Sequence, residues 1–169
     1  DISHTLAANV ENLTLTGSVN IEGSGNELAN IITGNASNNI LDGGQGIDVL
    51  KGGAGNDTYK VDLTTANLFQ DTVTENLNEG TDTLILRGGN TTLVTVSSLT
   101  LGANLENLDA SGTGSSKLNL TGNGLDNILT GNNAVNILDG GIGTDTLIGG
   151  LGNDCYIFSR GCGSDTVRA

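Results

Sequence analysis

Apolar residues recur every nine positions in two stretches of the chain, each time after a run rich in glycine and asparagine. From Gly25 the chain reads GNELANIIT, GNASNNILD, GGQGIDVLK and GGAGNDTYK, and from Gly122 it reads GNGLDNILT, GNNAVNILD, GGIGTDTLI and GGLGNDCYI. Glycine, asparagine and aspartate tolerate the positive φ angles of tight turns, so the first six residues predict a turn. The last three residues predict a short strand.

The eighth residue of each nonapeptide is large and apolar or aromatic. A strand of three residues cannot bury its apolar face alone, so successive coils must stack. The pattern therefore predicts an all-β fold, a right-handed parallel β-roll or β-solenoid with two nonapeptides per coil. We expect a thin core made by the eighth-position side chains, which are Ile32, Leu41, Leu50, Tyr59, Leu129, Leu138, Leu147 and Tyr156.

A longer repeat divides the chain into two units. Residues 5–17 recur at 100–112, and residues 25–61 recur at 122–158. The first unit, residues 1–99, is expected to hold lead-in strands, the repeats at 25–60 and a spacer at 62–99 that forms less regular β coils. The second unit, residues 100–169, is expected to hold lead-in strands and repeats at 122–165. We expect both units to form one continuous solenoid.

Charge and composition exclude two classes of function. The 169 residues include 19 acidic and 6 basic side chains, a net charge of −13. A nucleic-acid-binding protein needs basic residues to neutralise phosphates, so no nucleic-acid partner is expected. No apolar run approaches the 18 residues typical of a membrane span. The chain begins without a methionine and without a leader in which basic residues precede an apolar run. We therefore interpret it as an excised or processed segment.

An acid or its amide occupies the sixth position of every nonapeptide. Carboxylate and carbonyl oxygens are the ligands of hard cations, and a flexible, carbonyl-rich turn favours Ca²⁺ over Mg²⁺. Stacking places turns n and n+2 on the same edge, so one ion could take ligands from both. An asparagine could instead hydrogen-bond within its own turn, which we favour for Asn30 and Asn127. The sixth-position residues are Asn30, Asn39, Asp48, Asp57, Asn127, Asn136, Asp145 and Asp154.

Four of the nonapeptides, GGQGIDVLK, GGAGNDTYK, GGIGTDTLI and GGLGNDCYI, resemble the GGxGxDxUx repeat of the hemolysin-type calcium-binding (RTX) family. The four GN nonapeptides beside them are similar to degenerate repeats of that family. The resemblance implies a parallel β-roll that folds on binding Ca²⁺. It also implies a secreted, extracellular protein, exported by the type I secretion machinery of a Gram-negative bacterium.

The resemblance also implies a set of calcium ligands. The carboxylates would be those of Asp48, Asp57, Asp145 and Asp154. Backbone carbonyls would come from Gly43, Gly44, Gln45, Gly46, Gly52, Gly53, Ala54, Gly55, Gly140, Gly141, Ile142, Gly143, Gly149, Gly150, Leu151 and Gly152. A further turn after a two-residue slip adds Asp165 with Gly161 and Gly163. Weaker candidates are Asn39, Asn136, Asp71 and Asp82.

We expect a non-enzymatic calcium-binding module of a larger secreted protein, because the sequence shows no G-x-S-x-G motif, no P-loop and no histidine-based nucleophile pair. One rival is an accessory module of a polysaccharide-modifying enzyme, such as an epimerase or a lyase, that grips an extracellular polysaccharide. It would need a basic, aromatic-bearing stripe on one face, which Lys51, Lys60, Arg87 and Lys117 do not obviously form. The other rival is an adhesin or an ice-binding solenoid, which would need a regular rank of threonine.

Overall fold

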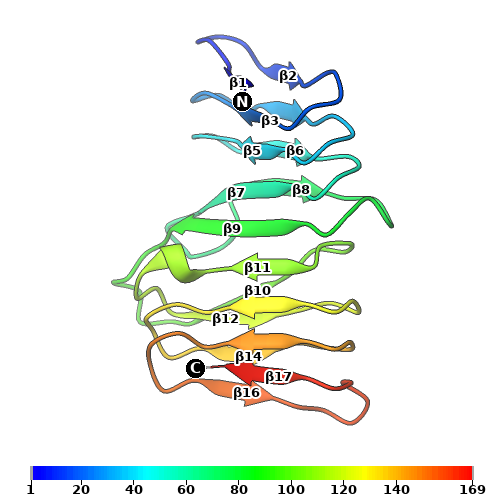
Figure 1. Cartoon of the computed structure of the whole chain (residues 1–169). Helices are drawn as coiled ribbons and strands as arrows, with labels where there is room; N and C mark the ends of the chain where they lie inside the picture. The colour runs from blue at the N-terminus through cyan, green and yellow to red at the C-terminus, as the bar shows by residue number, and fades with distance from the viewer. Residues whose placement is uncertain (1, 169) are drawn as a thin grey trace.

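The chain folds into a parallel β-solenoid in which successive coils stack along one axis (Figure 1). The structure is a computed structural model and describes residues 2–168. Its strands are β1 (Ile2–Thr5), β2 (Asn12–Thr14), β3 (Ile21–Ser24), β4 (Ile31–Thr33), β5 (Ile40–Asp42), β6 (Val49–Lys51), β7 (Thr58–Leu63), β8 (Thr72–Thr74), β9 (Thr83–Gly88), β10 (Ser97–Thr100), β11 (Asn107–Asp109), β12 (Leu118–Thr121), β13 (Ile128–Thr130), β14 (Ile137–Asp139), β15 (Thr146–Ile148), β16 (Cys155–Ile157) and β17 (Thr166–Arg168). Within residues 2–168 the one helical element is the 3-10 turn η1 (Ser111–Thr113), and no helix has the length and apolar character needed to cross a membrane.

The odd-numbered strands form one continuous nine-stranded sheet. The even-numbered strands form two four-stranded sheets on the opposite face, β2-β4-β6-β8 and β10-β12-β14-β16. In the repeats each strand pairs in parallel with the strand two nonapeptides later, as Ile31 pairs with Val49 and Ile40 with Thr58. This register confirms the predicted all-β roll with two nonapeptides per coil.

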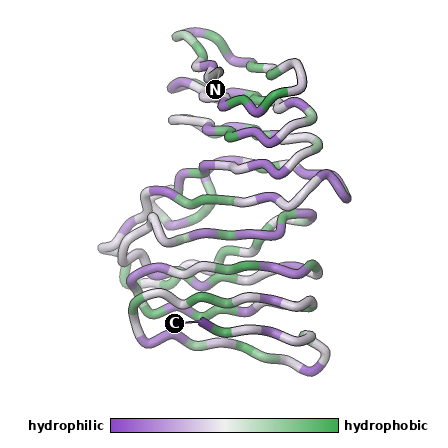
Figure 2. The backbone as a smooth tube through the Cα atoms, in the orientation of Figure 1, coloured by the Kyte–Doolittle hydropathy of each residue, from purple (hydrophilic) through white to green (hydrophobic). Residues whose placement is uncertain are grey.

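The core is a thin file of aliphatic side chains between the two faces. Hydrophobic segments recur in every coil of the stack (Figure 2), and seven of the eight predicted eighth-position side chains are fully buried. The exception is Tyr156, which packs against the core but stays partly exposed. Tyr156 belongs to β16, the last strand of its sheet, so no further described strand covers it.

The spacer between the repeats forms wider coils, as predicted. Strands β7 and β9 are six residues long, twice the length of the repeat strands, and Thr58 pairs with Thr83 across a longer connection. The extra residues add Val61, Leu63 and Leu86 to the core. The even-numbered face is interrupted between β8 and β10, while the nine-stranded sheet runs through without a break.

Candidate functional site

The turns between strands line up along two edges of the solenoid. We call the turns that precede a strand of the nine-stranded sheet the leading edge and those that follow one the trailing edge. The leading edge holds residues 15–20, 34–39, 52–57, 75–82, 101–106, 122–127, 140–145 and 158–165. The trailing edge holds residues 6–11, 25–30, 43–48, 64–71, 89–96, 110–117, 131–136 and 149–154.

A ladder of hydrogen bonds joins the sixth-position residues along each edge. The backbone N–H of one residue donates to a side-chain oxygen of its counterpart in the next turn of that edge. Asp71 and Asp82, which the sequence marked only weakly, are regular rungs of these ladders. The bonds on the leading edge are Asn39 to Asp57 (2.6 Å), Asp57 to Asp82 (2.8 Å), Asp82 to Glu106 (2.7 Å), Asn127 to Asp145 (2.8 Å) and Asp145 to Asp165 (3.0 Å). Those on the trailing edge are Asn30 to Asp48 (2.7 Å), Asp48 to Asp71 (3.0 Å) and Asn136 to Asp154 (2.9 Å).

The four turns that begin Gly-Asn close themselves with amide hydrogen bonds, and we call them the amide turns (residues 25–30, 34–39, 122–127 and 131–136). In the first of them, the Asn26 N–H donates to Asn30 Oδ1 (2.8 Å), and Asn30 Nδ2 donates to the Val10 carbonyl (3.1 Å). The same N–H to Oδ1 bond recurs in the other three turns at 2.8–2.9 Å. An asparagine therefore satisfies its turn without a cation.

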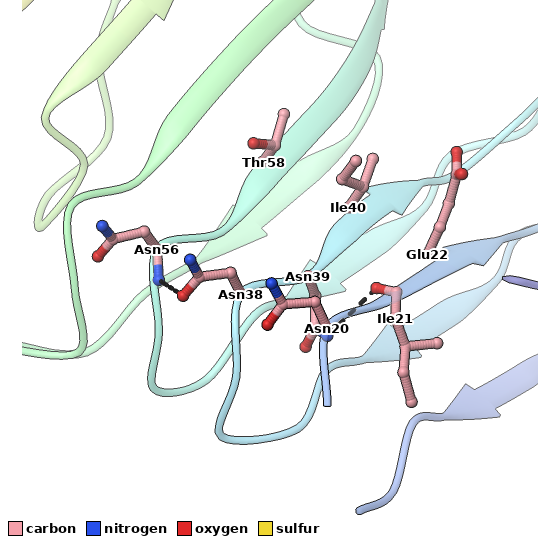
Figure 3. A pocket seen from close by; sticks show the side chains of 8 residues that line it. All are labelled: Asn20, Ile21, Glu22, Asn38, Asn39, Ile40, Asn56 and Thr58. Atoms are coloured by element: carbon pink, nitrogen blue, oxygen red, sulfur yellow. Dashed lines mark hydrogen bonds between the residues drawn. The ribbon is translucent and has the colours of Figure 1, made fainter. Parts of the chain in front are cut away.

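Amide side chains of ladder residues and of their neighbours also line a pocket on the leading edge (Figure 3). The Asn56 N–H donates to Asn38 Oδ1 (2.8 Å), and Asn39 Nδ2 donates to the Ile21 carbonyl (3.2 Å). Among the residues that line this pocket, Glu22 is the one carboxylate, so the pocket offers a poor oxygen cage for a hard cation.

The four turns that begin Gly-Gly leave their aspartate oxygens open, and we call them the carboxylate turns (residues 43–48, 52–57, 140–145 and 149–154). Their second residue is a glycine with positive φ, 84° at Gly44 and 92° at Gly141. In two of these turns the N–H of this glycine donates to the aspartate that ends the preceding strand: Gly44 to Asp42 Oδ1 (3.1 Å) and Gly141 to Asp139 Oδ1 (3.2 Å). Among residues 2–168, buried Oδ2 atoms without a hydrogen-bond partner occur at Asp48, Asp57 and Asp145.

The first glycine of each carboxylate turn is required by space. A Cβ at Gly52 or Gly140 would lie less than 3.0 Å from Oδ2 of the aspartate in its own turn, closer than real Cβ atoms approach a neighbour. The same holds for Gly43 and Gly149. The missing side chain leaves the aspartate oxygen facing bare backbone, so a cation there could also reach carbonyl oxygens.

Burial makes these aspartates poor isolated anions. Loss of hydration raises the pKa of Asp48 and Asp145 above the usual range and raises the pKa of Asp57 to about 6. A buried charge without a partner is strongly unfavourable, and a cation removes that cost. Buried, unpartnered carboxylate oxygens beside a glycine backbone fit Ca²⁺, which takes six to eight oxygen ligands.

The remaining predicted residues lie in the same turns with differing surroundings. The side chains of Gln45, Ala54, Ile142 and Leu151 are exposed, and the ligands expected from these residues are their backbone carbonyls. Asp154 is half-buried, because its turn is the last described one of the trailing edge.

The final turn, which follows the two-residue slip, stacks in register on the turn at 140–145. Thr146 pairs with Thr166, and Gly143 forms a bridge with Gly163. The two additional residues of this turn are Phe158 and Ser159, which precede the part that is in register with residues 140–145. Asp165 consequently lies against Asp145, whose N–H donates to Asp165 Oδ1 (3.0 Å).

On the trailing edge, an amide side chain occupies one predicted ligand. Gln70 Nε2 donates to the Gly46 carbonyl oxygen. Asp71 lies beside it, and burial raises its pKa to about 6. A side-chain amide of the spacer therefore binds one of the carbonyl oxygens that the sequence predicts as a calcium ligand.

Sequence reasoning missed one buried acid, Glu75. Both of its carboxylate oxygens are buried without a hydrogen-bond partner among the described residues. Burial, followed by the charges of Asp82 and Asp57, raises its pKa to about 8. The sequence signal was weak because Glu75 lies in the spacer, where the nine-residue period is absent.

Two segments of the chain, residues 24–59 and 121–154, match the family model of the RTX calcium-binding nonapeptide repeat, with four copies in all. These segments contain the four amide turns and the four carboxylate turns. Comparison with curated proteins and with solved structures gives no match.

Proposed function

The chain carries RTX nonapeptide repeats, which bind Ca²⁺, and we propose that it is a non-enzymatic calcium-binding module of a larger secreted protein. Its repeat turns would fold around Ca²⁺ after export through a type I secretion machinery, which would be a transient partner. RTX repeats are typical of secreted bacterial proteins, and this supports an extracellular location for the folded module.

One observation carries the proposal: the buried Oδ2 atoms of Asp48, Asp57 and Asp145 have no hydrogen-bond partner in the described chain. With a net charge of −13, the chain repels itself when no cation is bound, which favours an extended state suited to export. Extracellular modules bind Ca²⁺ with dissociation constants of about 10⁻⁴–10⁻³ M. Binding energy at sites that exist only in the folded state becomes folding energy.

A role in gripping an acidic polysaccharide has less support. Two of the basic residues on the nine-stranded sheet are already paired with acids: Arg87 contacts Asp42 (2.7 Å) and Asp62 (3.1 Å), and Lys60 contacts Glu22 (3.1 Å). Paired cations leave little positive potential for an anionic glycan. An accessory role in a polysaccharide-modifying enzyme, or an adhesive role, remains the alternative proposal.

Circular dichroism with and without Ca²⁺ tests the proposed function. The chain should be much less stable and less rich in β structure in EDTA than at millimolar Ca²⁺, with Mg²⁺ a poor substitute because it demands a more rigid octahedral shell. An equal β signal in EDTA and in Ca²⁺ would contradict calcium-coupled folding.

A further inference from the structure

The turn at 75–82 lies outside both matched segments but stacks on the last carboxylate turn of the first unit. It joins β8 to β9 and contacts residues 52–57 through three hydrogen bonds. Gly55 N–H donates to the Glu79 carbonyl (2.7 Å), Thr81 N–H to Asn56 Oδ1 (3.0 Å), and Asp57 N–H to Asp82 Oδ1 (2.8 Å). The spacer thus supplies a turn that continues the leading edge without the glycine pattern.

Three buried carboxylates meet between these two turns. Asp57, Glu75 and Asp82 are 1%, 8% and 1% exposed, and one oxygen of each lies within 4.8 Å of the other two. Both oxygens of Glu75 and Oδ2 of Asp57 lack a hydrogen-bond partner among residues 2–168. The ion pairs of the described chain reach only Glu22, Asp42 and Asp62, so no basic side chain neutralises this cluster.

The separation of these oxygens is compatible with one shared calcium ion. Ca²⁺ binds oxygen at about 2.3–2.6 Å, so two oxygens on one ion can be at most about 5 Å apart. The ligands are all carboxylates, without the histidine or cysteine that zinc sites use. Three carboxylates also give a stronger Coulomb attraction than the one or two available at a repeat turn.

We propose that Asp57, Glu75 and Asp82 hold a Ca²⁺ ion at the joint between the first repeats and the spacer. The proposal deepens the proposed function, on which it rests through Asp57, and it adds a ligand, Glu75, that belongs to no nonapeptide. The opposite edge of the same coil differs, because there the Gln70 amide already covers the Gly46 carbonyl.

An ion at this joint would act on both repeat units. The spacer turn also contacts the lead-in turn of the second unit: Asp82 N–H donates to Glu106 Oε2 (2.7 Å), and Asn104 Nδ2 donates to the Glu75 carbonyl (3.0 Å). Fixing Glu75 and Asp82 to Asp57 would therefore hold residues 75–82 between turns 52–57 and 101–106.

Calcium titration calorimetry of Glu75→Gln tests the site. Its matched control is Glu27→Gln, which makes the same charge change at an exposed residue of an amide turn. Glu75→Gln should bind one ion fewer than the wild type, or bind it at least tenfold more weakly, while Glu27→Gln keeps the wild-type isotherm. In EDTA, Glu75→Gln should be no less stable than the wild type, because the substitution removes one of three crowded charges.

A terbium experiment locates the ion without relying on stability. A Cβ at Gly52 would lie less than 3.0 Å from both Asp57 Oδ2 and the Tyr59 hydroxyl oxygen, so Tyr59 lies beside the proposed ion. The chain has two tyrosines and no tryptophan, so Tyr59 is the one sensitiser left in Tyr156→Phe. Tyrosine-sensitised Tb³⁺ emission should be strong in Tyr156→Phe and several-fold weaker when Glu75→Gln is added.

The outcomes separate the two proposals. Wild-type protein that binds no Ca²⁺ would overturn both the proposed function and this site. Wild-type protein that binds Ca²⁺, with Glu75→Gln showing the same stoichiometry, affinity and Tb³⁺ emission, would overturn this site alone.

Discussion

The amide turns and the carboxylate turns follow the same course around the solenoid but reach closure differently. In the amide turn at 122–127, Asn123 N–H donates to Asn127 Oδ1 (2.8 Å), so the turn is complete. In the carboxylate turn stacked on it, Gly141 N–H donates instead to Asp139 Oδ1 (3.2 Å), and Asp145 Oδ2 stays buried without a partner. The residues at positions two and six therefore decide the type of turn. Asparagine at both positions gives a turn that satisfies its own hydrogen bonds, whereas glycine and aspartate give a turn that needs a cation.

The difference shows how one chain can combine a fixed scaffold with calcium-dependent parts. Asparagine carries both a donor and an acceptor, whereas an ionised aspartate only accepts. A buried acceptor that loses its partner costs about 1–3 kcal/mol, and more when it is charged. The amide turns therefore contribute stability at any Ca²⁺ concentration, whereas the carboxylate turns contribute theirs when Ca²⁺ is bound.

Changing the pH should produce the largest effect on the stability of the calcium-free chain. A change of pH alters the protonation of all the buried acids together and leaves the amides unchanged. Burial raises the pKa of Asp57 and Asp71 to about 6 and that of Glu75 to about 8. The unfolded values lie near 4, so between about pH 4 and pH 8 the folded, calcium-free chain binds more protons than the unfolded chain. Its stability should fall as the pH rises through this window. Thermal unfolding in EDTA should show a Tm several degrees higher at pH 5 than at pH 8.

Calcium should reverse the sign of this pH dependence. The ion binds the ionised carboxylates and competes with protons, so stability in millimolar Ca²⁺ should rise with pH over the same window. A calcium-free Tm that rises with pH would contradict the comparison, since it would mean that the buried acids are already stabilised as anions.

Adding one methyl group to a carboxylate turn should give the next largest effect. Gly140→Ala places a Cβ less than 3.0 Å from Asp145 Oδ2, whereas Gly124→Ala, in the neighbouring amide turn, meets nothing within 4 Å. We expect Gly140→Ala to cost about 1–3 kcal/mol, as overpacking does, and to lose more stability in Ca²⁺ than in EDTA. Gly124→Ala should be nearly neutral in both. Chemical denaturation measures the free energy of unfolding of both variants in Ca²⁺ and in EDTA. Equal losses of stability in the two variants would show that the space beside Asp145 does not hold an ion.

Exchanging the sixth-position residues should give the smallest and most specific effect. Asp145 stacks on Asp165, so Asp145→Asn removes one of two carboxylates and should weaken Ca²⁺ binding there by about tenfold, or ~1.4 kcal/mol. Asn136→Ala instead removes an acceptor for Asn132 N–H (2.9 Å) and should lower stability with and without Ca²⁺. Calorimetry should therefore show the larger loss of affinity in Asp145→Asn. Equal losses in both variants would mean that Asp145 and Asp165 do not share an ion.

The regular parts of the molecule could be predicted from the sequence because each nonapeptide repeats the same local choice. The eighth-position side chains such as Leu41 and Leu129 are buried as expected, and the glycines at the second and fourth positions of the carboxylate turns, such as Gly53 and Gly55, have positive φ. Even the slip before Asp165 leaves the strand register intact. Periodicity carries this information because stacking forces equivalent residues into equivalent surroundings.

The parts that the sequence predicts only weakly, as for Asp71 and Asp82, or not at all, as for Glu75, lie in the spacer. Asp71 and Asp82 lie on the ladders only because the wider coils bring them into register with Asp48 and Asp57, and connection length alone does not fix that register. Glu75 is buried through stacking of its turn on residues 52–57. The hydrogen bonds that close the amide turns also depend on the direction in which the N–H of the second turn residue points. The residue type at this position, asparagine in Asn26 and glycine in Gly44, favours one direction but does not specify it.

The sixth-position ladder also makes each edge of the solenoid a short polyelectrolyte. Neighbouring rungs are separated by about 4.8 Å, the spacing of paired strands, whereas two unit charges in water interact by more than the thermal energy within about 7 Å. Asp57, Asp82 and Glu106 form three successive charged rungs, and Asn127 then interrupts the line before Asp145 and Asp165. Mobile counterions should gather along such a line as they do along nucleic acids. Monovalent salt therefore competes with Ca²⁺ over whole runs of rungs, and each asparagine rung sets where one run ends and the next begins.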